Sequence, residues 1–297
     1  MFDPNHQPEQ IETYLRNALG ARVNFIRGTI LPKSTREAPW RVDVILNSIP
    51  KAYVLYIDSD DLEREYRVMK ALEPQPIATP GVYGLDLSGE ALGVPCFLSD
   101  FVEGESMLGP VQAGEAWAEQ LYIDSVCALQ AITEQQLGSV APNLKRETAL
   151  DVLREAYSFL KDKSLPVADA AYQALISRLP EFPSIRFSNG DLWLDNFIVR
   201  ERQLAGVIDF QNATFSDPIY EFLLSFFVVP ELQGRGIEAR FCRRIGCDPA
   251  ILQWYHGLEY LDTWRWVLVT GEPFVHHTAE SLEMNLQAWL AEVQGSG

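Results

Sequence analysis

The sequence predicts an α+β protein of two lobes, in which a small antiparallel β lobe precedes a larger, mainly helical lobe. Residues 21–102 contain short alternating or continuous apolar segments, which are typical of strands. From about residue 111, apolar residues recur at helical spacing over longer segments. With 297 residues, 47% of them hydrophobic, the chain can bury a substantial core. We place the lobes at 1–102 and 103–297, joined near 101–110.

The first lobe is expected to begin with a helix over residues 8–19, which Pro8 opens and Gly20 ends. A second helix is expected over residues 59–72, where Ser59 can cap the N-terminus and apolar residues recur on one face. It follows the third of five expected strands. These strands are RVNFIRG (22–28), WRVDVIL (40–46), AYVLYI (52–57), VYGLDL (82–87) and VPCFLSDFV (94–102).

The second lobe is expected to contain six amphipathic or buried helices, interrupted once by the segment 188–210 with its short strands. No repeat or low-complexity tract occurs in it. The expected helices cover 113–132, 147–162, 167–179, 216–227, 248–269 and 278–293.

Net charge and hydropathy exclude two classes of partner. The formal net charge is −17 at pH 7, and such a surface repels nucleic acid and anionic membranes. No segment has the ~18 uninterrupted apolar residues of a membrane-spanning helix. The N-terminal residues are acidic and polar, without a signal-peptide pattern, so we expect a cytoplasmic location. The sequence leaves the oligomeric state open.

Residues 188–200, SNGDLWLDNFIVR, place Asp191 five positions before Asn196, at the start of an expected hairpin. Its strands, 196–200 and 205–210, are joined by the polar segment ERQL. If Arg200 faces Ala205 across the loop, Asn196 pairs with Asp209. Carboxylate and amide oxygens then meet at one end of the hairpin, and such hard donors suit Mg²⁺. The alternative is a surface Asn-Gly turn and an acidic hairpin end.

The spacing of these residues favours a kinase. Kinase catalytic loops place a base Asp and a metal-binding Asn as D-x-x-x-x-N, followed by a second metal-binding Asp on a short strand. Asp191 and Asn196 satisfy the first part, and Asp209 in the segment IDF satisfies the second. One D-x-x-x-x-N match is weak by itself, but its combination with the hairpin and the second acid is much more specific.

The segments NGDLWLDNFIV, LAGVIDF and SDPIYEF resemble the aminoglycoside phosphotransferase and choline kinase family of small-molecule kinases, whose fold is protein-kinase-like. The resemblance also covers LEREYRVMKALEPQPIATPGVYG and VPCFLSDFVEGES, so that it extends over most of residues 20–230. It implies ATP as co-substrate, Mg²⁺ as cofactor, and a small-molecule acceptor as the other partner.

The resemblance also implies roles for single residues. Asp191 would orient or deprotonate the substrate hydroxyl, while Asn196 and Asp209 would hold Mg²⁺ on the nucleotide phosphates. Nucleotide binding would involve Glu65, as the helix acid, and the backbone of Asp100, Phe101 and Val102, which would contact adenine. Asp217 either supports the catalytic loop or only caps a helix.

Three departures from the family pattern concern mainly the binding of the nucleotide. Tyr56 occupies the strand position of the phosphate-binding Lys or Arg, so that Glu65 is either part of an altered site or a solvated helix residue. The segment RGTILPKSTREAPWRV has one glycine, which is too few for a close backbone cradle around phosphate. Asn189 replaces the usual His before Gly190, where an amide can still support the loop. Lys33, Arg36 or Arg41 could supply the missing positive charge.

The acceptor side is less specific. Residues 252–266 are rich in aromatic residues and include Glu259 and Asp262, and this combination suits a cationic or amino-bearing substrate. The alternative is ordinary core packing, because the aromatic residues have near-helical spacing.

Three hypotheses follow. The first is an ATP- and Mg²⁺-dependent kinase for a hydroxyl of a small, cationic or amino-bearing molecule. The second is a nucleotide-binding or ligand-binding pseudokinase without phosphotransfer activity, favoured by Tyr56 and the glycine-poor loop. The third is another nucleotidyl chemistry on the same fold.

Overall fold

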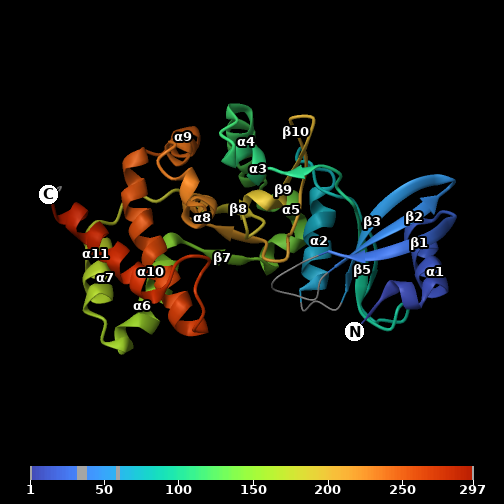
Figure 1. Cartoon of the computed structure of the whole chain (residues 1–297), viewed down its shortest axis with the longest axis horizontal. Coiled ribbons are helices and arrows are strands. Elements are labelled where there is room, and N and C mark those ends of the chain that lie inside the picture. The colour runs from blue at the N-terminus through green and yellow to red at the C-terminus, as the bar shows by residue number, and fades with distance from the viewer. Residues whose placement is uncertain (1, 32–38, 58–60, 296–297) are drawn as a thin grey trace. The chain divides into compact units, whose positions relative to one another are not determined.

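The computed structural model describes residues 2–31, 39–57 and 61–295, which form two compact units (Figure 1). The first unit contains Met1–Gly109, Ile132–Leu144 and Asp195–Ala213, and the second contains Pro110–Ala131, Lys145–Leu194 and Thr214–Gly297. The lobe boundary that we placed at residue 102 stays a prediction.

The first unit is built on a five-stranded antiparallel sheet with the strand order β1-β2-β3-β5-β4. All five strands expected from the sequence are present, and together with the helical second unit they confirm the predicted α+β class. The strands are β1 Val23–Ile30, β2 Trp40–Leu46, β3 Ile49–Ile57, β4 Val82–Asp86 and β5 Cys96–Asp100.

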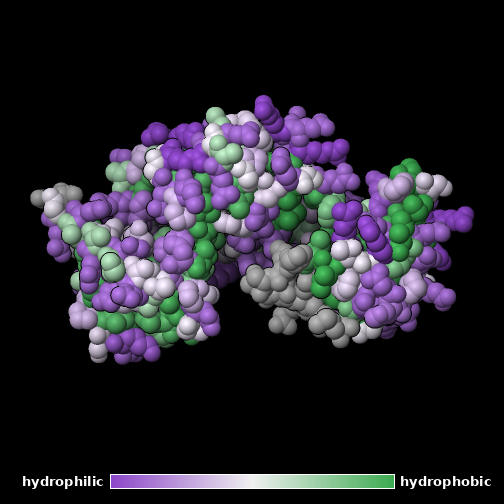
Figure 2. Space-filling view, in the orientation of Figure 1, coloured by the Kyte–Doolittle hydropathy of each residue, from purple (hydrophilic) through white to green (hydrophobic). Residues whose placement is uncertain are grey.

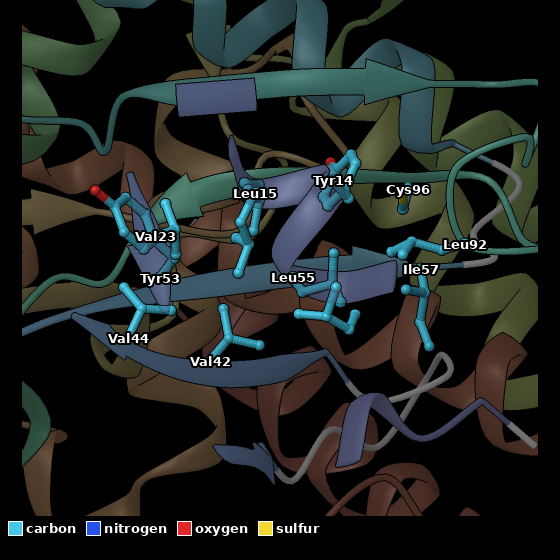
Figure 3. Packing of buried hydrophobic residues seen from close by; sticks show 12 residues of the cluster. Tyr14, Leu15, Val23, Val42, Val44, Tyr53, Leu55, Ile57, Leu92 and Cys96 are labelled. Carbon is cyan, nitrogen blue, oxygen red and sulfur yellow. The ribbon is translucent and has the colours of Figure 1, made fainter. Parts of the chain in front are cut away.

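The sheet carries one helix on each face, because strand side chains point alternately to opposite sides. Helix α1 (Pro8–Leu19) ends at Gly20, which is left-handed with φ 59°, and buries Leu15 against Val42 and Leu55 (Figure 3). Helix α2 (Leu62–Leu72) contacts the opposite face, where its Tyr66 meets the ring of Phe97 edge-on. Ser59, the expected cap of this helix, lies outside the described residues.

A second sheet of the first unit, with the order β10-β9-β6, contains the expected hairpin. The segment near 101–110, expected as a connection between lobes, contributes its edge strand. Gly104 fits there because a Cβ atom would lie 2.4 Å from the carbonyl oxygen of Val199. The strands and short helices of this region are β6 Glu105–Ser106, α5 Glu134–Leu137, η2 Gly138–Asn143, β9 Phe197–Arg200 and β10 Gln203–Val207.

The second unit is mainly helical, and all six expected helices are present. Helix α10 is its centre and packs against α6, α7, α8 and α11. The sequence did not predict α9 or the small three-stranded sheet, in which β11 lies between β7 and β8. The elements are α4 Ala116–Gln130, β7 Lys145–Glu147, α6 Ala149–Leu160, α7 Pro166–Ser177, β8 Arg186–Ser188, β11 Thr214–Ser216, α8 Pro218–Val228, α9 Ile237–Arg244, η6 Pro249–Ile251, α10 Leu252–Thr270 and α11 Ala279–Gly295.

Hydrophilic residues cover most of the surface seen in Figure 2, as the net charge of −17 requires. Among the helices of residues 2–31, 39–57 and 61–295, none is long and apolar enough to cross a bilayer. The cytoplasmic location and the absence of nucleic-acid and membrane partners stay predictions.

Candidate active site

The loop that carries Asp191 leaves strand β8 and is held by its own side chains. Asn189 is fully buried, and its Nδ2 donates to the carbonyl oxygen of Asp191 over 2.9 Å. The amide of Asp191 donates back to Asn189 Oδ1 over 3.3 Å, and Gly190 N–H donates to the hydroxyl oxygen of Ser188. Gly190 adopts φ 78°, which a residue with a Cβ rarely allows. The expected supporting role of Asn189 is thus confirmed.

The chain immediately after Asp191 is anchored by Leu192. The carbonyl oxygen of Leu192 accepts hydrogen bonds from Tyr122 Oη (2.6 Å) and Ser225 Oγ (3.2 Å), and all three side chains are buried. Since α4 contributes the tyrosine and α8 the serine, two helices fix this one carbonyl. Asp191 therefore lies on a loop whose backbone is restrained on both sides, which is consistent with the catalytic role expected for it.

Glu221, in the first turn of α8, is a site residue that the sequence analysis missed. The hydroxyl of Ser188 donates to its Oε2 over 3.4 Å. Burial, together with the nearby carboxylates of Asp191 and Glu147, raises the pKa of Glu221 to about 7. The available signal was the segment SDPIYEF, one of the segments that carry the family resemblance, in which Glu221 follows Asp217 by four positions.

Asp217 caps helix α8. Its Oδ1 accepts the N–H groups of Ile219 and Tyr220, and its Oδ2 accepts the hydroxyl of Tyr255 over 2.7 Å. The side chain is 2% exposed, and burial raises its pKa. Of the two roles considered for Asp217, the N-cap is therefore confirmed.

The hairpin has a different register from the one we expected. Arg200 pairs with Gln203 rather than Ala205, because the turn has two residues, Glu201 and Arg202, both with positive φ (54° and 61°). A bulge between Leu204 and Gly206 then shifts the pairing by one residue.

As a result, Asn196 lies opposite Ile208 instead of Asp209, and its carbonyl oxygen accepts the N–H of Ile208 over 2.9 Å. Asn196 and Asp209 still lie at the same end of the hairpin, but the pairing is shifted by one residue from the expected one. Asp209 has φ 61°, a left-handed conformation that is costly for a residue with a Cβ and that concentrates at functional sites. The main chain just beyond it is held by α2, since Arg64 Nη2 donates to the carbonyl oxygen of Gln211 over 2.6 Å.

The donor set of Asn196 and Asp209 fits Mg²⁺, which takes oxygen ligands and retains water or phosphate oxygens. Within residues 2–31, 39–57 and 61–295, no group of three or more His, Cys, Asp and Glu side chains is arranged to hold a metal. A site formed by the Asp209 carboxylate and the Asn196 amide is not a group of this kind, so the two residues stay predicted ligands.

The residues expected to contact adenine lie at the end of β5. The N–H of Asp100 donates to the carbonyl oxygen of Gly81 over 2.9 Å, and its carboxylate accepts the N–H of Gly81 and the hydroxyl of Tyr83. Phe101 N–H donates to the carbonyl oxygen of Ala52. Val102 N–H makes no hydrogen bond with any residue that the structure describes. Of the three expected residues, Val102 therefore has the amide available for a purine edge.

Glu65 and Tyr56 lie on the α2 side of the first sheet. Glu65 is 0% exposed, so the alternative of a solvated helix residue is wrong. Tyr56 lies opposite Phe97 in the β3–β5 pairing and stacks on its ring. Lys51 differs from Tyr56 by an odd number of positions and therefore points to the α1 face, where it cannot replace the missing lysine.

Of the three basic residues considered as replacements, Lys33 and Arg36 lie outside the described residues. The guanidinium of Arg41 lies over the ring of Phe101, 4.4 Å from its centroid. Its Nε donates to Asp43 Oδ1 over 2.8 Å. Arg41 is thus a cation fixed beside the segment that is expected to contact adenine.

Residues 43–268 match the model of the phosphotransferase enzyme family, over more than half of the chain. The chain belongs to this family. A curated relative, acyl-CoA dehydrogenase family member 10 of Mus musculus, is 26% identical over 237 residues, which cover 73% of this chain. The match spans only 22% of the length of that relative.

Solved structures of phosphotransferases share the fold. The chain superposes with a TM-score of 0.71 and 15% identity on a protein from Ralstonia eutropha JMP134, provisionally described as an aminoglycoside phosphotransferase, covering 97% of this chain and 98% of that one. The superposition on a thermostable mutant of aminoglycoside phosphotransferase APH(4)-Ia, in complex with AMP-PNP and hygromycin B, has a TM-score of 0.65 at 17% identity. It covers 95% of this chain and 98% of that one. A type I macrolide 2′-phosphotransferase gives 0.60 at 15% identity, covering 96% of both chains. These likenesses confirm the protein-kinase-like fold expected from the sequence.

Proposed function

We propose that this phosphotransferase transfers the γ-phosphoryl group of ATP to a hydroxyl of a small cationic or amino-bearing molecule, with Mg²⁺ as cofactor. The observation that carries the proposal is the restrained loop that presents Asp191, followed by the hairpin that brings Asn196 and Asp209 to one end. The nucleotide complex of the related APH(4)-Ia structure supports ATP as donor.

In the proposed reaction, the acceptor oxygen forms a bond to the γ-phosphorus as the bond to the ADP oxygen breaks. Asp191 orients the acceptor hydroxyl and takes its proton. Asn196 and Asp209 would hold Mg²⁺, which would neutralise charge on the phosphate oxygens. Val102 N–H would bind the purine edge. Glu221 lies near Asp191 with a pKa of about 7, so that its ionisation changes the charge around the proposed base.

An acidic, aromatic cavity in the second unit supports a cationic acceptor. It encloses about 140 Å³ and is lined by Phe226, Phe227, Tyr260, Glu238 and Glu259 among others. Glu259 is 4% exposed, and its carboxylate makes no hydrogen bond or ion pair with any described residue. Burial and the neighbouring carboxylates, Asp262 first among them, raise its pKa well above the usual range. An ammonium group would offset this cost and pack against the aromatic rings.

The first test is the thermal midpoint with ATP, with Mg²⁺ and with both. We expect a rise with ATP and Mg²⁺ together, by mass action on the native state, and its loss in Asp209→Ala. Glu103→Ala, which removes an exposed carboxylate of the same unit, should respond like the wild type. No rise with any nucleotide would refute the nucleotide site and with it the kinase.

Phosphoryl transfer is then measured on amino alcohols and aminoglycosides, with Glu259→Gln as the variant. We expect a higher KM for cationic acceptors in this variant and little change in kcat. The second candidate function is a nucleotide-binding pseudokinase, which the stacked Tyr56 favours. A thermal shift with ATP and Mg²⁺, but no transfer to any acceptor, would support that candidate.

A further inference from the structure

A cavity of the second unit lies at the start of β8, whose other end leads into the Asp191 loop. It encloses about 750 Å³, within the usual size range of small-molecule sites. Its walls come from the end of α7, the segment 180–186, the turn after α9, the start of α10, and α11. None of the residues proposed above for phosphoryl transfer lines it.

One part of the wall is aromatic and presents apolar surface. Phe182 meets Trp254 edge-on, with ring centroids 4.9 Å apart, and Trp289 lies on the α11 side. The indole N–H of Trp254 donates to the carbonyl oxygen of Leu175, and that of Trp289 donates to the carbonyl oxygen of Gln253. Both N–H groups are thus occupied, and Trp254 and Trp289 are at most 6% exposed, so the indoles offer only narrow edges of ring carbons. Phe182 is half-buried, and its ring suits contact with a planar apolar body.

Another part of the wall is cationic. Arg186 is half-buried, and its guanidinium makes no hydrogen bond or ion pair with any residue that the structure describes. Its guanidinium carries five N–H donors in a planar fork that matches an acidic group. Arg178 is held in place by a 2.6 Å hydrogen bond from Nη1 to the carbonyl oxygen of Val293, which leaves its other N–H groups available.

The acidic residues of the wall do not neutralise these arginines directly. Glu181 and Asp248 are exposed, and neither forms an ion pair with Arg178 or Arg186. Asp248 Oδ1 already accepts the N–H of Ala250. The half-buried Arg186 therefore favours an anion inside the cavity.

We propose that this cavity binds a small planar organic anion, with its ring against Phe182 and Trp254 and its carboxylate, sulfonate or phosphate on Arg186 and Arg178. The proposal is independent of the phosphoryl transfer proposed above. Binding of an anion in this cavity would nevertheless affect the loop that carries Asp191. Arg186 begins the strand that ends at Ser188, and Tyr255, next to Trp254, donates to the α8 cap Asp217.

The test uses 8-anilinonaphthalene-1-sulfonate, an anion with a planar naphthalene ring, titrated into the folded full chain and followed by its fluorescence. We expect one saturable site and much weaker binding of the uncharged analogue N-phenyl-1-naphthylamine. Arg186→Gln should weaken binding of the sulfonate at least about tenfold, because a charge-assisted contact is lost. Arg154→Gln, an exposed arginine on α6 outside the cavity, should bind like the wild type.

Ala250→Trp provides a second variant, which retains both arginines and fills the cavity from its rim. It should abolish binding of the sulfonate while its circular dichroism spectrum and thermal midpoint stay close to those of the wild type. Equal affinity of the charged and uncharged probes would overturn the proposal, and so would wild-type affinity in either cavity variant. Absence of saturable binding to the wild type would overturn it as well.

Discussion

Tyr56 stacks on Phe97 with ring centroids 4.4 Å apart and ring planes 6° apart, at the strand position where the resembled kinases have a basic residue. Both residues are at most 7% exposed, and the pair lies on the face of the sheet that α2 contacts. The nucleotide site proposed above therefore needs a cation from another residue to neutralise the phosphates. The position serves packing, which explains how the fold is retained without the lysine.

Tyr56→Ala should lower the free energy of unfolding by about 3 kcal/mol, because it removes a buried aromatic ring and leaves Phe97 without its stacking partner. Urea unfolding measures the change. Tyr172→Ala is the matched control. Tyr172 also stacks on a tyrosine, Tyr157, but both are partly exposed on the surface of α6 and α7, and its loss should cost about 1 kcal/mol or less. Equal losses of unfolding free energy in the two variants would show that the buried Tyr56–Phe97 stack stabilises the protein no more than the partly exposed Tyr157–Tyr172 stack.

Long, patterned segments were predictable from the sequence, whereas pairings that depend on single residues were not. The five strands and six helices carry clear apolar periodicity. The hairpin register failed because Glu201 and Arg202 adopt positive φ without the Asn or Gly that usually marks such a turn. The bulge at Ala205 then shifted the pairing of Asn196. The three-residue strands β7, β8 and β11 are too short for any pattern to reveal.

The residues of the candidate site that are marked by their spacing along the chain could be predicted. Those whose properties depend on burial could not. Asp191, Asn196 and Asp209 were selected by their spacing together with the expected hairpin, and their roles stay predictions. Residue type could not reveal that Glu65 is fully buried, because an acidic helix residue is usually solvated. Likewise, the raised pKa of Glu221 depends on burial and on carboxylates that are distant in sequence, such as Glu147.

Asn189→Ala should loosen the loop of Asp191, because it removes both hydrogen bonds between the buried amide and the backbone of Asp191. Hydrogen–deuterium exchange of a peptide covering residues 188–194 should become about tenfold faster or more, which corresponds to 1.4 kcal/mol or more of lost local stability. Asn143→Ala, which removes an exposed amide that donates to Ser139, should leave this peptide unchanged. Unaltered exchange in Asn189→Ala would mean that Leu192 and its partners hold the loop without the amide.

Asp191→Asn and Asp209→Ala should distinguish activation of the acceptor from binding of the metal and nucleotide in the proposed mechanism. Asp191→Asn removes the proposed base and should reduce phosphoryl transfer by about 10²–10⁴-fold, while the thermal shift with ATP and Mg²⁺ persists. Asp209→Ala should abolish both, because it removes a proposed metal ligand. Transfer rates and thermal midpoints of the same preparations give the comparison. Loss of the thermal shift in Asp191→Asn would argue against its assignment to the acceptor.

Glu221→Gln should change how stability depends on pH. The pKa of Glu221 is raised from 4.5 to about 7, so that the folded state holds a proton that the unfolded state releases between these values. Its contribution to stability is therefore fully present below about pH 4.5 and is lost as the pH rises through 7. Relative to the wild type, Glu221→Gln should gain about 2 kcal/mol between pH 5 and pH 8.

Urea unfolding at pH 5 and at pH 8 measures the difference for Glu221→Gln. Glu103→Gln removes an exposed carboxylate that pairs with Arg200 on the surface, and it should show the same small offset at both pH values. A pH-independent effect of Glu221→Gln would place the pKa of Glu221 in its ordinary range. In that case the carboxylates of Asp191 and Glu147 would be screened from it by solvent, and Glu221 would be ionised throughout the pH range in which the protein works.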